Sequence, residues 1–387
     1  MSKSNVMNTY GRFDVTFEKG VGSKVYDTNG KEYIDFVSGV AVNSLGHSHE
    51  AMIKALNEQS LKLIHVSNLY WNIPQINLAK KLAAYSHHDQ VFFCNSGTEA
   101  VETGLKLARK YGKLKSNTKN TIIHMKNSFH GRTLGALAVT GQEKYQKDFM
   151  PLMEGIKAVA FNDIQDLEKN MNEDICAVII EPIQGEGGVL KAQKDFLQKA
   201  RELCDEFDAL LIFDEVQCGI GRTGNLFAYQ SFGTVPDVIC MAKGLGGGFP
   251  IGATLANERS ASAFSPGDHG CTFGGNPLAC AVSLSVLEEL VDKGIIDQVN
   301  EKSEYFVDKI ENLKNKYPII EDIQGMGLML GMKVNIEPKA IVNKCFEKGL
   351  LLVGAGKDVV RILPPLNVKN EDIEKALGIL EKVLREL

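Results

Sequence analysis

The chain has 387 residues, of which 44% are hydrophobic and 24% charged, and its formal net charge is −5. This length predicts about two domains and is enough to bury a large core, and the negative charge argues against a nucleic-acid-binding protein. Neither a signal peptide nor a membrane span is expected, because the first ten residues lack an apolar segment and no apolar run approaches about 18 residues.

The N-terminal segment, up to about residue 50, alternates in the way that is typical of strands, and Asn29-Gly30 is a hairpin signal within it. After residue 50, short apolar runs such as VFFC, TIIHM, CAVII, LLIF, DVIC and GATLA alternate with longer amphipathic segments. This pattern predicts buried parallel strands joined by crossover helices. Functional residues are therefore expected at the carboxyl ends of the strands.

The last hundred residues differ from the middle. VVRILPPLNV predicts a strand that breaks at Pro364-Pro365, and a final helix is expected over residues 371–387. We therefore predict an α/β fold with a large domain, residues 50–280, built on a mostly parallel central sheet. A smaller α+β domain is expected to combine residues 1–49 with residues 281–387.

Eight cysteines are scattered along the chain without a C-x-x-C pair, and several lie inside apolar runs. The spacing gives no support to a metal site or a redox motif, so no metal is predicted. Free thiols suit a reducing cytoplasm, which is the expected location.

The first strand end that carries chemistry is CNSGTEA, residues 94–100. Ser96 and Glu99 have the spacing of a capping box, so a helix is expected to begin here. Free amides at a helix N-terminus bind anions, and Gly97 allows close approach. A helix cap without any ligand explains the same residues.

Two further loops follow strands. NSFHGRT places Phe129, His130 and Arg132 together, so that an aromatic ring could stack on a planar group and a guanidinium could hold a carboxylate. EPIQGEGGV, starting at Glu181, could line a pocket with carboxylates. A solvated surface loop and a plain glycine-rich turn are the alternatives for these two stretches.

LLIFDEVQCGIGRTG ends a buried strand in Asp214-Glu215. A carboxylate at such a position needs a partner, either a metal, an arginine or a cationic ligand, unless it caps a turn. Residues 219–224 match G-x-G-x-x-G, but they lie late in the domain and away from a first strand-to-helix turn. A nicotinamide site is therefore the weaker hypothesis here.

Lys243 follows the strand DVICMA and precedes GLGGG. A lysine at a buried strand end has its pKa lowered by desolvation, which makes the amine a nucleophile suited to Schiff bases. The glycines are expected to leave space beside this amine. A lysine that extends to solvent is the alternative.

Together these strand ends supply an anion site, an aromatic ring, an acid and a lysine. Pyridoxal phosphate offers one counterpart for each of them: a phosphate, a planar ring, a pyridine nitrogen and an aldehyde. This combined match is more specific than any single motif.

The motifs NSGTEA, FHGRT, EPIQGEGG, FDEVQCGIGRTG, AKGLGGGFPIGA and TFGGNPLACA occur in this order, and with SGVAVNSLGHSH and VRILPPL they cover essentially the whole chain. The sequence resembles the class III aminotransferases, which are fold type I pyridoxal-phosphate enzymes. GVAVNSLGH, VSNLYWN and HGCTFGGNPLACA are similar to the subgroup that acts on N-acetylornithine.

The resemblance implies a role for each matching residue. Lys243 holds the cofactor as a Schiff base, Asp214 pairs with the pyridinium nitrogen, and Phe129 stacks on the ring. The remaining residues implied to bind the cofactor are Ser96, Gly97, Thr98, Glu215, Val216, Gln217 and, reaching the phosphate of a neighbouring subunit, Thr272. The residues implied to bind substrates are Arg132, Glu186, Cys271 and Arg361.

The activity implied is ping-pong transamination of N2-acetyl-L-ornithine with 2-oxoglutarate, which gives N-acetyl-L-glutamate 5-semialdehyde and L-glutamate, in arginine biosynthesis. Thr272 implies a homodimer. Val40 stands where enzymes specific for free ornithine have tyrosine, which favours an acylated amine, and either Tyr70 or Trp71 gates the substrate. The alternatives are succinylornithine, 4-aminobutyrate or ornithine as amine, an aminomutase, a nicotinamide dehydrogenase, or a non-catalytic binding module.

Overall fold

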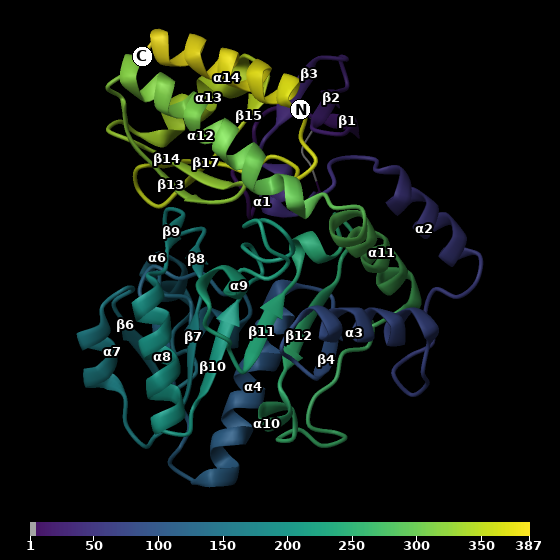
Figure 1. Cartoon of the computed structure of the whole chain (residues 1–387), viewed down its shortest axis with the longest axis vertical. Coiled ribbons are helices and arrows are strands. Elements are labelled where there is room, and N and C mark those ends of the chain that lie inside the picture. Colours follow the sequence, from purple (N-terminus) through teal and green to yellow (C-terminus); the bar gives the residue numbers. More distant parts are fainter. Residues whose placement is uncertain (1–4) are drawn as a thin grey trace.

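In the computed structural model, which describes residues 5–387, a seven-stranded sheet forms the centre of the lower part of the molecule (Figure 1). Its strand order is β4-β12-β11-β10-β7-β5-β6. The strands are β4 (Gln90–Cys94), β5 (Thr121–Met125), β6 (Ile156–Val159), β7 (Ile175–Ile180), β10 (Leu210–Asp214), β11 (Val238–Met241) and β12 (Gly252–Ala256).

Neighbouring strands in β6 to β11 are parallel, which confirms the mostly parallel sheet. β12, which was predicted among the parallel strands, instead runs antiparallel to β11 and to β4. The chain returns directly from β11 through a short glycine-rich turn, and a connection without a crossover helix can only deliver an antiparallel neighbour.

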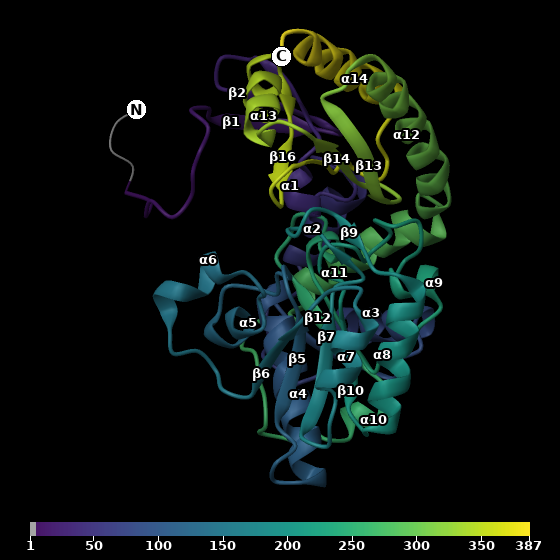
Figure 2. The same ribbon diagram turned by 90° about the vertical axis from the view of Figure 1, so that its left-hand side faces the viewer.

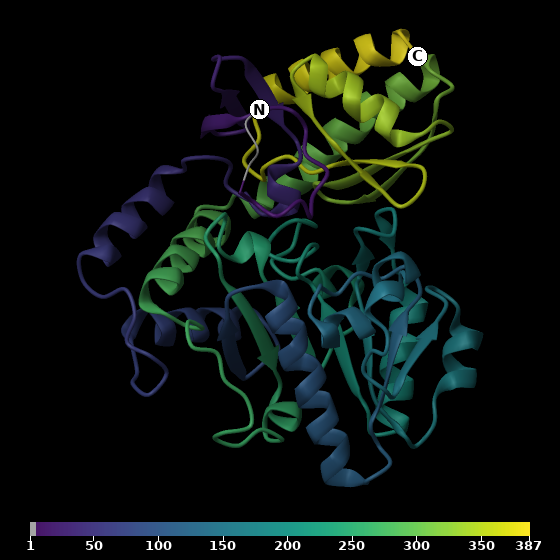
Figure 3. The same ribbon diagram turned by 180° about the vertical axis from the view of Figure 1, so that it is seen from behind.

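Helices cover both faces of this sheet, so the central strands are buried on both sides. Figure 1 shows α7 (Ile164–Asn170) and α8 (Lys194–Glu206) on the near face, and Figure 3 shows α4 (Gly97–Lys115) crossing the far face. Every residue of β7 and β10 is buried, which is why their sequences are nearly continuous apolar runs.

The upper part of the molecule is built from both ends of the chain. One sheet has the order β1-β2-β3-β15, and the other has the order β13-β14-β17-β16. These strands are β1 (Phe17–Val21), β2 (Lys24–Asp27), β3 (Glu32–Asp35), β13 (Ile320–Met326), β14 (Met329–Val334), β15 (Leu350–Leu351), β16 (Val353–Ala355) and β17 (Val359–Ile362). Because β15 pairs with β3, the N-terminal hairpin and the C-terminal segment share a sheet.

Three long helices cover the outside of the upper sheets: α12 (Val299–Lys316), α13 (Pro338–Glu347) and α14 (Asn370–Arg385) (Figure 1). The predicted C-terminal helix is thus present, and its apolar residues, among them Ile373, Leu377 and Leu380, are buried. The predicted hairpin at Asn29-Gly30 is also present, with Gly30 at φ +81° in the turn between β2 and β3.

Two helices of the lower part, α2 (Glu50–Ser60) and α3 (Ile73–Tyr85), pack against α11 (Pro277–Leu287). The N-terminal arm before β1 projects from the upper part in Figure 2, but it keeps contact with the body, because Phe13 stacks on Phe346 with ring centres 4.5 Å apart and Tyr10 reaches the cavity described below. No helix within residues 5–387 has both the length and the apolar character needed to cross a bilayer.

Candidate active site

A cavity of about 600 Å³ lies at the carboxyl ends of the central strands, where parallel sheets usually bind ligands. It brings together side chains that are far apart in the sequence. The predicted residues that line it are Ser96, Gly97, Thr98, Phe129, Arg132, Asp214, Val216, Gln217 and Lys243.

The N-terminus of α4 forms one part of the floor. Ser96 is the N-cap: its hydroxyl accepts from the Glu99 amide at 3.3 Å and donates to the Glu99 carboxylate at 2.9 Å, as the capping-box spacing predicted. The amides of Gly97 and Thr98 have no acceptor among the described residues. A Cβ on Gly97 would lie 2.7 Å from Val216, so only glycine fits there. Two free amides at a helix N-terminus make an anion site.

Asp214, at the end of β10, forms the floor. Its Oδ2 lies 2.7 Å from Nδ1 of His130, and its Oδ1 accepts from the Val216 amide at 3.0 Å. The side chains of Asp214 and His130 are 5% and 0% exposed, so the carboxylate is held in one orientation. Glu215 is different: its carboxylate accepts from the amides of Ala228 and Tyr229, and burial raises its pKa to about 8. It does not line the cavity.

Lys243 follows β11, the strand next to β10 in the sheet. Its side chain is reached from the cavity, but burial of its amino group, together with the positive charge of Arg361, lowers the pKa of the amine. Its φ of +42° is left-handed, which is uncommon for a residue with a side chain. The structure therefore presents an amine that is more readily uncharged than an ordinary lysine.

Phe129 and Arg132 form the wall that follows β5. The Phe129 amide donates to Glu181 at 2.9 Å, and burial, together with the charge of Asp214, raises the pKa of Glu181. The Arg132 guanidinium lies 4.1 Å from the ring centre of Tyr145 and 5.5 Å from that of Phe129. These contacts hold the exposed Arg132 at the edge of the cavity.

Arg361, on β17 of the upper part, reaches the same region and is only 1% exposed. Its Nη1 donates to Glu186 at 2.6 Å and to Gln217 at 2.9 Å. Burial on its own raises the pKa of Glu186, but the guanidinium outweighs burial, and the pKa is lowered. A buried guanidinium paired with one carboxylate can exchange that partner for the carboxylate of a ligand.

Glu186, Glu215 and Arg361 do not line this cavity, and neither do four further predicted residues, Cys271, Thr272, Tyr70 and Trp71. Thr272 is exposed, and the Cys271 thiol accepts from the Asn95 amide group at 3.1 Å. Tyr70 and Trp71 line a separate cavity of about 400 Å³ and are 65% and 85% exposed.

The stretch that was expected to set amine specificity also differs in detail. Val40 packs against the hydrophobic core, and Val42 lines the cavity in its place. The reason is a left-handed turn: Ser38, Gly39, Val40 and Ala41 all have φ between +48° and +64°. The spacing of apolar residues in the sequence does not reveal this turn.

The glycines after Lys243 form a tight turn, and of these only Gly248 lines the cavity. A Cβ on Gly246 would lie 1.9 Å from the Phe249 carbonyl oxygen, and Gly247 has φ +56°. The expectation that these glycines mainly leave space beside the amine is therefore wrong for Gly246 and Gly247. Their role is to let the chain turn back from β11 to β12.

The G-x-G-x-x-G stretch, residues 219–224, joins the two parts of the molecule. Arg222 is 2% exposed, and its Nη1 donates to the carbonyls of Leu328 at 3.0 Å and Pro364 at 2.5 Å. A Cβ on Gly221 would lie 3.0 Å from Ile296 and Leu366. Protein atoms from the C-terminal part of the chain thus pack directly against this loop.

No role was predicted from the sequence for several residues that line the cavity, among them Tyr10, Val42 and, as the partner of Asp214, His130. A role for His130 could have been predicted from the sequence, because it follows a strand and is next to Phe129. Tyr10 comes from the N-terminal arm and Val42 from the segment after α1. No local sequence pattern connects either residue with the strand ends.

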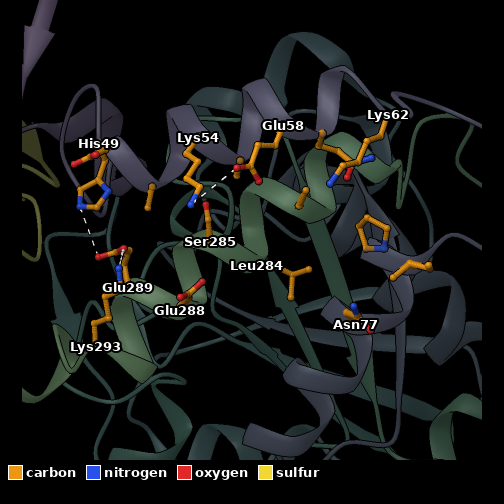
Figure 4. Close-up of a pocket in the computed structure, with 17 residues that line it drawn as sticks. His49, Lys54, Glu58, Lys62, Asn77, Leu284, Ser285, Glu288, Glu289 and Lys293 are labelled. Atoms are coloured by element: carbon orange, nitrogen blue, oxygen red, sulfur yellow. Dashed lines mark hydrogen bonds and ion pairs between the residues drawn. The ribbon is translucent and has the colours of Figure 1, made fainter.

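A second cavity, of about 740 Å³, lies between α2, α3 and α11 (Figure 4). Several of its polar side chains are paired with one another: His49 with Glu289 at 3.9 Å, Lys293 with Glu289 at 2.6 Å, and Lys54 with Glu58 at 3.9 Å. None of the predicted site residues line it. The cavity of about 600 Å³, which Lys243 and Asp214 line, is therefore the candidate active site.

The side chains and amides of this candidate active site fit pyridoxal phosphate. The free amides of Gly97 and Thr98 suit the phosphate, and the ring of Phe129 suits a planar ring. A fixed carboxylate, Asp214, and an amine with a lowered pKa, Lys243, suit the ring nitrogen and the aldehyde.

Comparison with known proteins gives a consistent result. A family model described as aminotransferase class-III matches residues 6–384. An acetylornithine aminotransferase of Clostridium acetobutylicum is 61% identical over 387 residues, which cover 100% of both chains.

Solved structures agree in fold. An ornithine aminotransferase of Toxoplasma gondii has a TM-score of 0.94 and 34% identity, covering 99% of this chain and 93% of that chain. An N-acetylornithine aminotransferase of Stenotrophomonas maltophilia has a TM-score of 0.86 and 38% identity, covering 97% of each chain.

Proposed function

This chain belongs to the class III aminotransferases, a pyridoxal-phosphate family, and we propose that it transfers the δ-amino group of N2-acetyl-L-ornithine to 2-oxoglutarate. The products are N-acetyl-L-glutamate 5-semialdehyde and L-glutamate, and the reaction belongs to arginine biosynthesis. The observation that carries the proposal is the single cavity in which Lys243 and Asp214, from neighbouring strands, meet the N-terminus of α4.

Bound pyridoxal phosphate supplies an aldehyde that carries an amino group between two substrates and a ring that withdraws electrons from the reacting carbon. Gly97 and Thr98 hold its phosphate through their amides, with the positive end of the α4 dipole behind them. Phe129, which lines the cavity, would stack on the ring. Asp214, oriented by His130 and by the Val216 amide, keeps the ring nitrogen protonated.

Lys243 has two tasks. Its amine would hold the cofactor between reactions, and in the reaction it would act as general base and acid, taking a proton from the carbon that bears the amino group and giving it back on the other side of the C–N bond. Attachment of the cofactor and removal of the proton both need an uncharged amine, which burial and Arg361 favour by lowering the pKa of Lys243.

The two half-reactions need different carboxylate sites. Arg132, at the edge of the cavity, binds the carboxylate of N-acetylornithine. While the amine substrate is bound, Glu186 occupies Arg361. When 2-oxoglutarate enters, Glu186 moves away and Arg361 takes the carboxylate next to the keto group. One site can then serve a substrate that has a carboxylate at this position and one that lacks it.

Reduction of the holoenzyme with borohydride, followed by mass spectrometry, tests the proposal. We expect the mass of the cofactor on the peptide that contains Lys243. Steady-state rates on a panel of amines, with 2-oxoglutarate as acceptor, then identify the donor as the amine with the highest kcat/KM. Absence of the adduct, or turnover without an amino acceptor, would exclude this reaction.

A second candidate is transamination of another ω-amine, such as succinylornithine, 4-aminobutyrate or free ornithine. The 61% identity to an acetylornithine aminotransferase, against 34% to an ornithine aminotransferase, supports the first proposal. A kcat/KM about tenfold higher on another amine, which is about 1.4 kcal/mol, would reassign the substrate.

A homodimer, with Thr272 directed to the phosphate of the neighbouring subunit, is part of the proposal. Supporting it is an exposed apolar surface beside Thr272, which includes Leu69, Trp71 and Phe273 at 84%, 85% and 61% exposure. Asn68 ties its two segments by donating to the Cys271 and Gly274 carbonyls. Patches of this kind mark interaction sites. Sedimentation of the wild type and of Trp71→Glu tests the assembly.

We further propose that the chain is divided into a large domain, residues 50–280, and a smaller domain built from both ends, and that the protein is cytoplasmic. The upper sheets join both termini, which supports the division. All eight cysteines are free, which suits a reducing compartment.

A further inference from the structure

The turn that carries Lys243 is held in an unfavourable backbone conformation. Lys243 has φ +42°, and the 3₁₀ turn from Lys243 to Leu245 begins directly at it. Conformations of this kind persist where the surrounding structure imposes them, and they are frequent at functional sites. The position of the Lys243 amine therefore depends on whatever fixes this turn.

Two buried serine hydroxyls fix it from outside. Ser44, in the segment after α1 (Ser38–Ala41), donates to the Gly244 carbonyl at 3.2 Å, and Ser283, on α11, donates to the Leu245 carbonyl at 2.8 Å. The two serines are 1% and 0% exposed. They come from different elements and bind successive carbonyls of the same turn.

Neither bond is the local one that a serine usually makes. A serine in a helix commonly donates to a carbonyl of its own preceding turn, as Ser285 does to Val282 at 2.7 Å. Ser283, two residues earlier on the same helix, donates instead to Leu245, whose carbonyl has no other donor among the described residues. Without Ser283 this buried acceptor would be unsatisfied.

Ser44 also connects the turn to the upper part of the molecule. Its own carbonyl accepts from the Leu366 amide at 2.8 Å, five residues beyond Arg361 on the same segment. One residue thus contacts both the turn of the nucleophile and the chain that carries the carboxylate-binding arginine.

We propose that Ser44 and Ser283 are positioning residues for Lys243. Their hydroxyls hold the carbonyls of Gly244 and Leu245 so that the backbone of Lys243 stays left-handed and its amine stays directed into the cavity. This inference rests on the proposed function, since it assumes that Lys243 binds the cofactor and moves the proton. It does not require either serine to touch a ligand.

The test uses Ser44→Ala, Ser283→Ala and the double variant, with Ser285→Ala as the matched control on α11. Three quantities are measured: the rate at which the apoenzyme attaches pyridoxal phosphate to Lys243 at saturating cofactor, followed by visible absorbance; kcat and KM; and the apoenzyme Tm.

We expect each single variant to attach the cofactor about three- to tenfold more slowly and to lose a similar factor in kcat, which is the range for one buried hydrogen bond. KM should stay within about twofold, because Arg132 and Arg361 lie on other elements. Ser285→Ala should behave as the wild type in attachment and in kcat.

The inference is overturned if the single variants match Ser285→Ala in both rates, or if their only change is a lower Tm. Should the double variant fail to fold, the single variants decide. A wild-type protein that attaches no cofactor to Lys243 would overturn the proposed function itself, whereas normal attachment by both the wild type and the variants would overturn only the role of the two serines.

Discussion

The floor and the upper wall of the active site are built in different ways. The floor consists of the N-terminus of α4, Asp214 and Lys243, each placed directly at the end of a strand or the start of a helix. The upper wall consists of Glu186, Gln217 and Arg361, which meet only because the upper part of the molecule packs over the sheet. The floor is thus set by local order along the chain, and the wall by tertiary contact.

This difference suggests different tolerances. Floor residues have fixed partners, such as the His130–Asp214 bond at 2.7 Å between two buried side chains. In the wall, Glu186 is 25% exposed, and Arg361 donates to Gln217 as well as to Glu186, so Glu186 can leave while Arg361 keeps one partner. Substitutions in the floor should abolish chemistry with either substrate, whereas substitutions in the wall should affect one half-reaction.

Lys243→Ala should give the largest effect. Loss of the general base and acid should lower kcat by about 10³-fold with both substrates. Initial rates and borohydride trapping measure the change, and Lys54→Ala, at a 73% exposed lysine, is the control. Retention of full activity by Lys243→Ala would remove the distinction between floor and wall.

Asp214→Asn should rank second. An amide cannot keep the ring nitrogen protonated and leaves His130 without its carboxylate, so kcat should fall by about 10²-fold in both half-reactions. Stopped-flow rates for each half-reaction check this, with Asp205→Asn, at a 57% exposed carboxylate, as control. A defect confined to one substrate would contradict the assignment of Asp214 to the floor.

Arg361→Lys tests the wall. A lysine cannot hold a carboxylate with two parallel hydrogen bonds, so the KM for 2-oxoglutarate should rise by about 10- to 30-fold, while the KM for the amine changes by less than about threefold. Arg385→Lys, at a 69% exposed arginine, is the control. Equal loss with both substrates would mean that Arg361 belongs functionally with the floor.

The smallest effect concerns pH and links the two regions. Attachment of the cofactor needs an uncharged Lys243 amine. Because the pKa of Lys243 is lowered from its usual 10.5, the attachment rate should rise with pH and level off below pH 10.5. Arg361→Met removes a positive neighbour and should move the midpoint up, and Glu186→Gln removes a negative neighbour and should move it down. If the pH midpoint of attachment is the same in both variants as in the wild type, the wall does not influence the floor.

Much of the floor could be predicted from the sequence. The spacing of Ser96 and Glu99 indicates the start of a helix, and Asp214 places a charge at the end of an apolar run. Both sites can therefore be predicted from rules that act over a few residues. Arg361 and Glu186 were assigned through family resemblance, because nothing local marks β17 as part of a site. Val42, in place of Val40, faces the cavity because of a left-handed turn, which hydrophobic periodicity does not record.

By itself the sequence determined the alternation of strands and helices, the buried central strands, and the strand ends at which an anion, a ring and an amine could be bound. These features depend on apolar spacing and on caps, which act locally. Only the tertiary structure decided that β12 runs antiparallel, that Glu215 faces away from the cavity, that Arg222 fills the G-x-G-x-x-G loop and that two distant serines hold the turn of Lys243. For Arg222 and the two serines, the physical reason is that each depends on which buried hydrogen-bonding group finds its partner across the core, 38 to 200 residues away along the chain. The direction of β12 and the orientation of Glu215 depend instead on short connections whose geometry apolar spacing does not record.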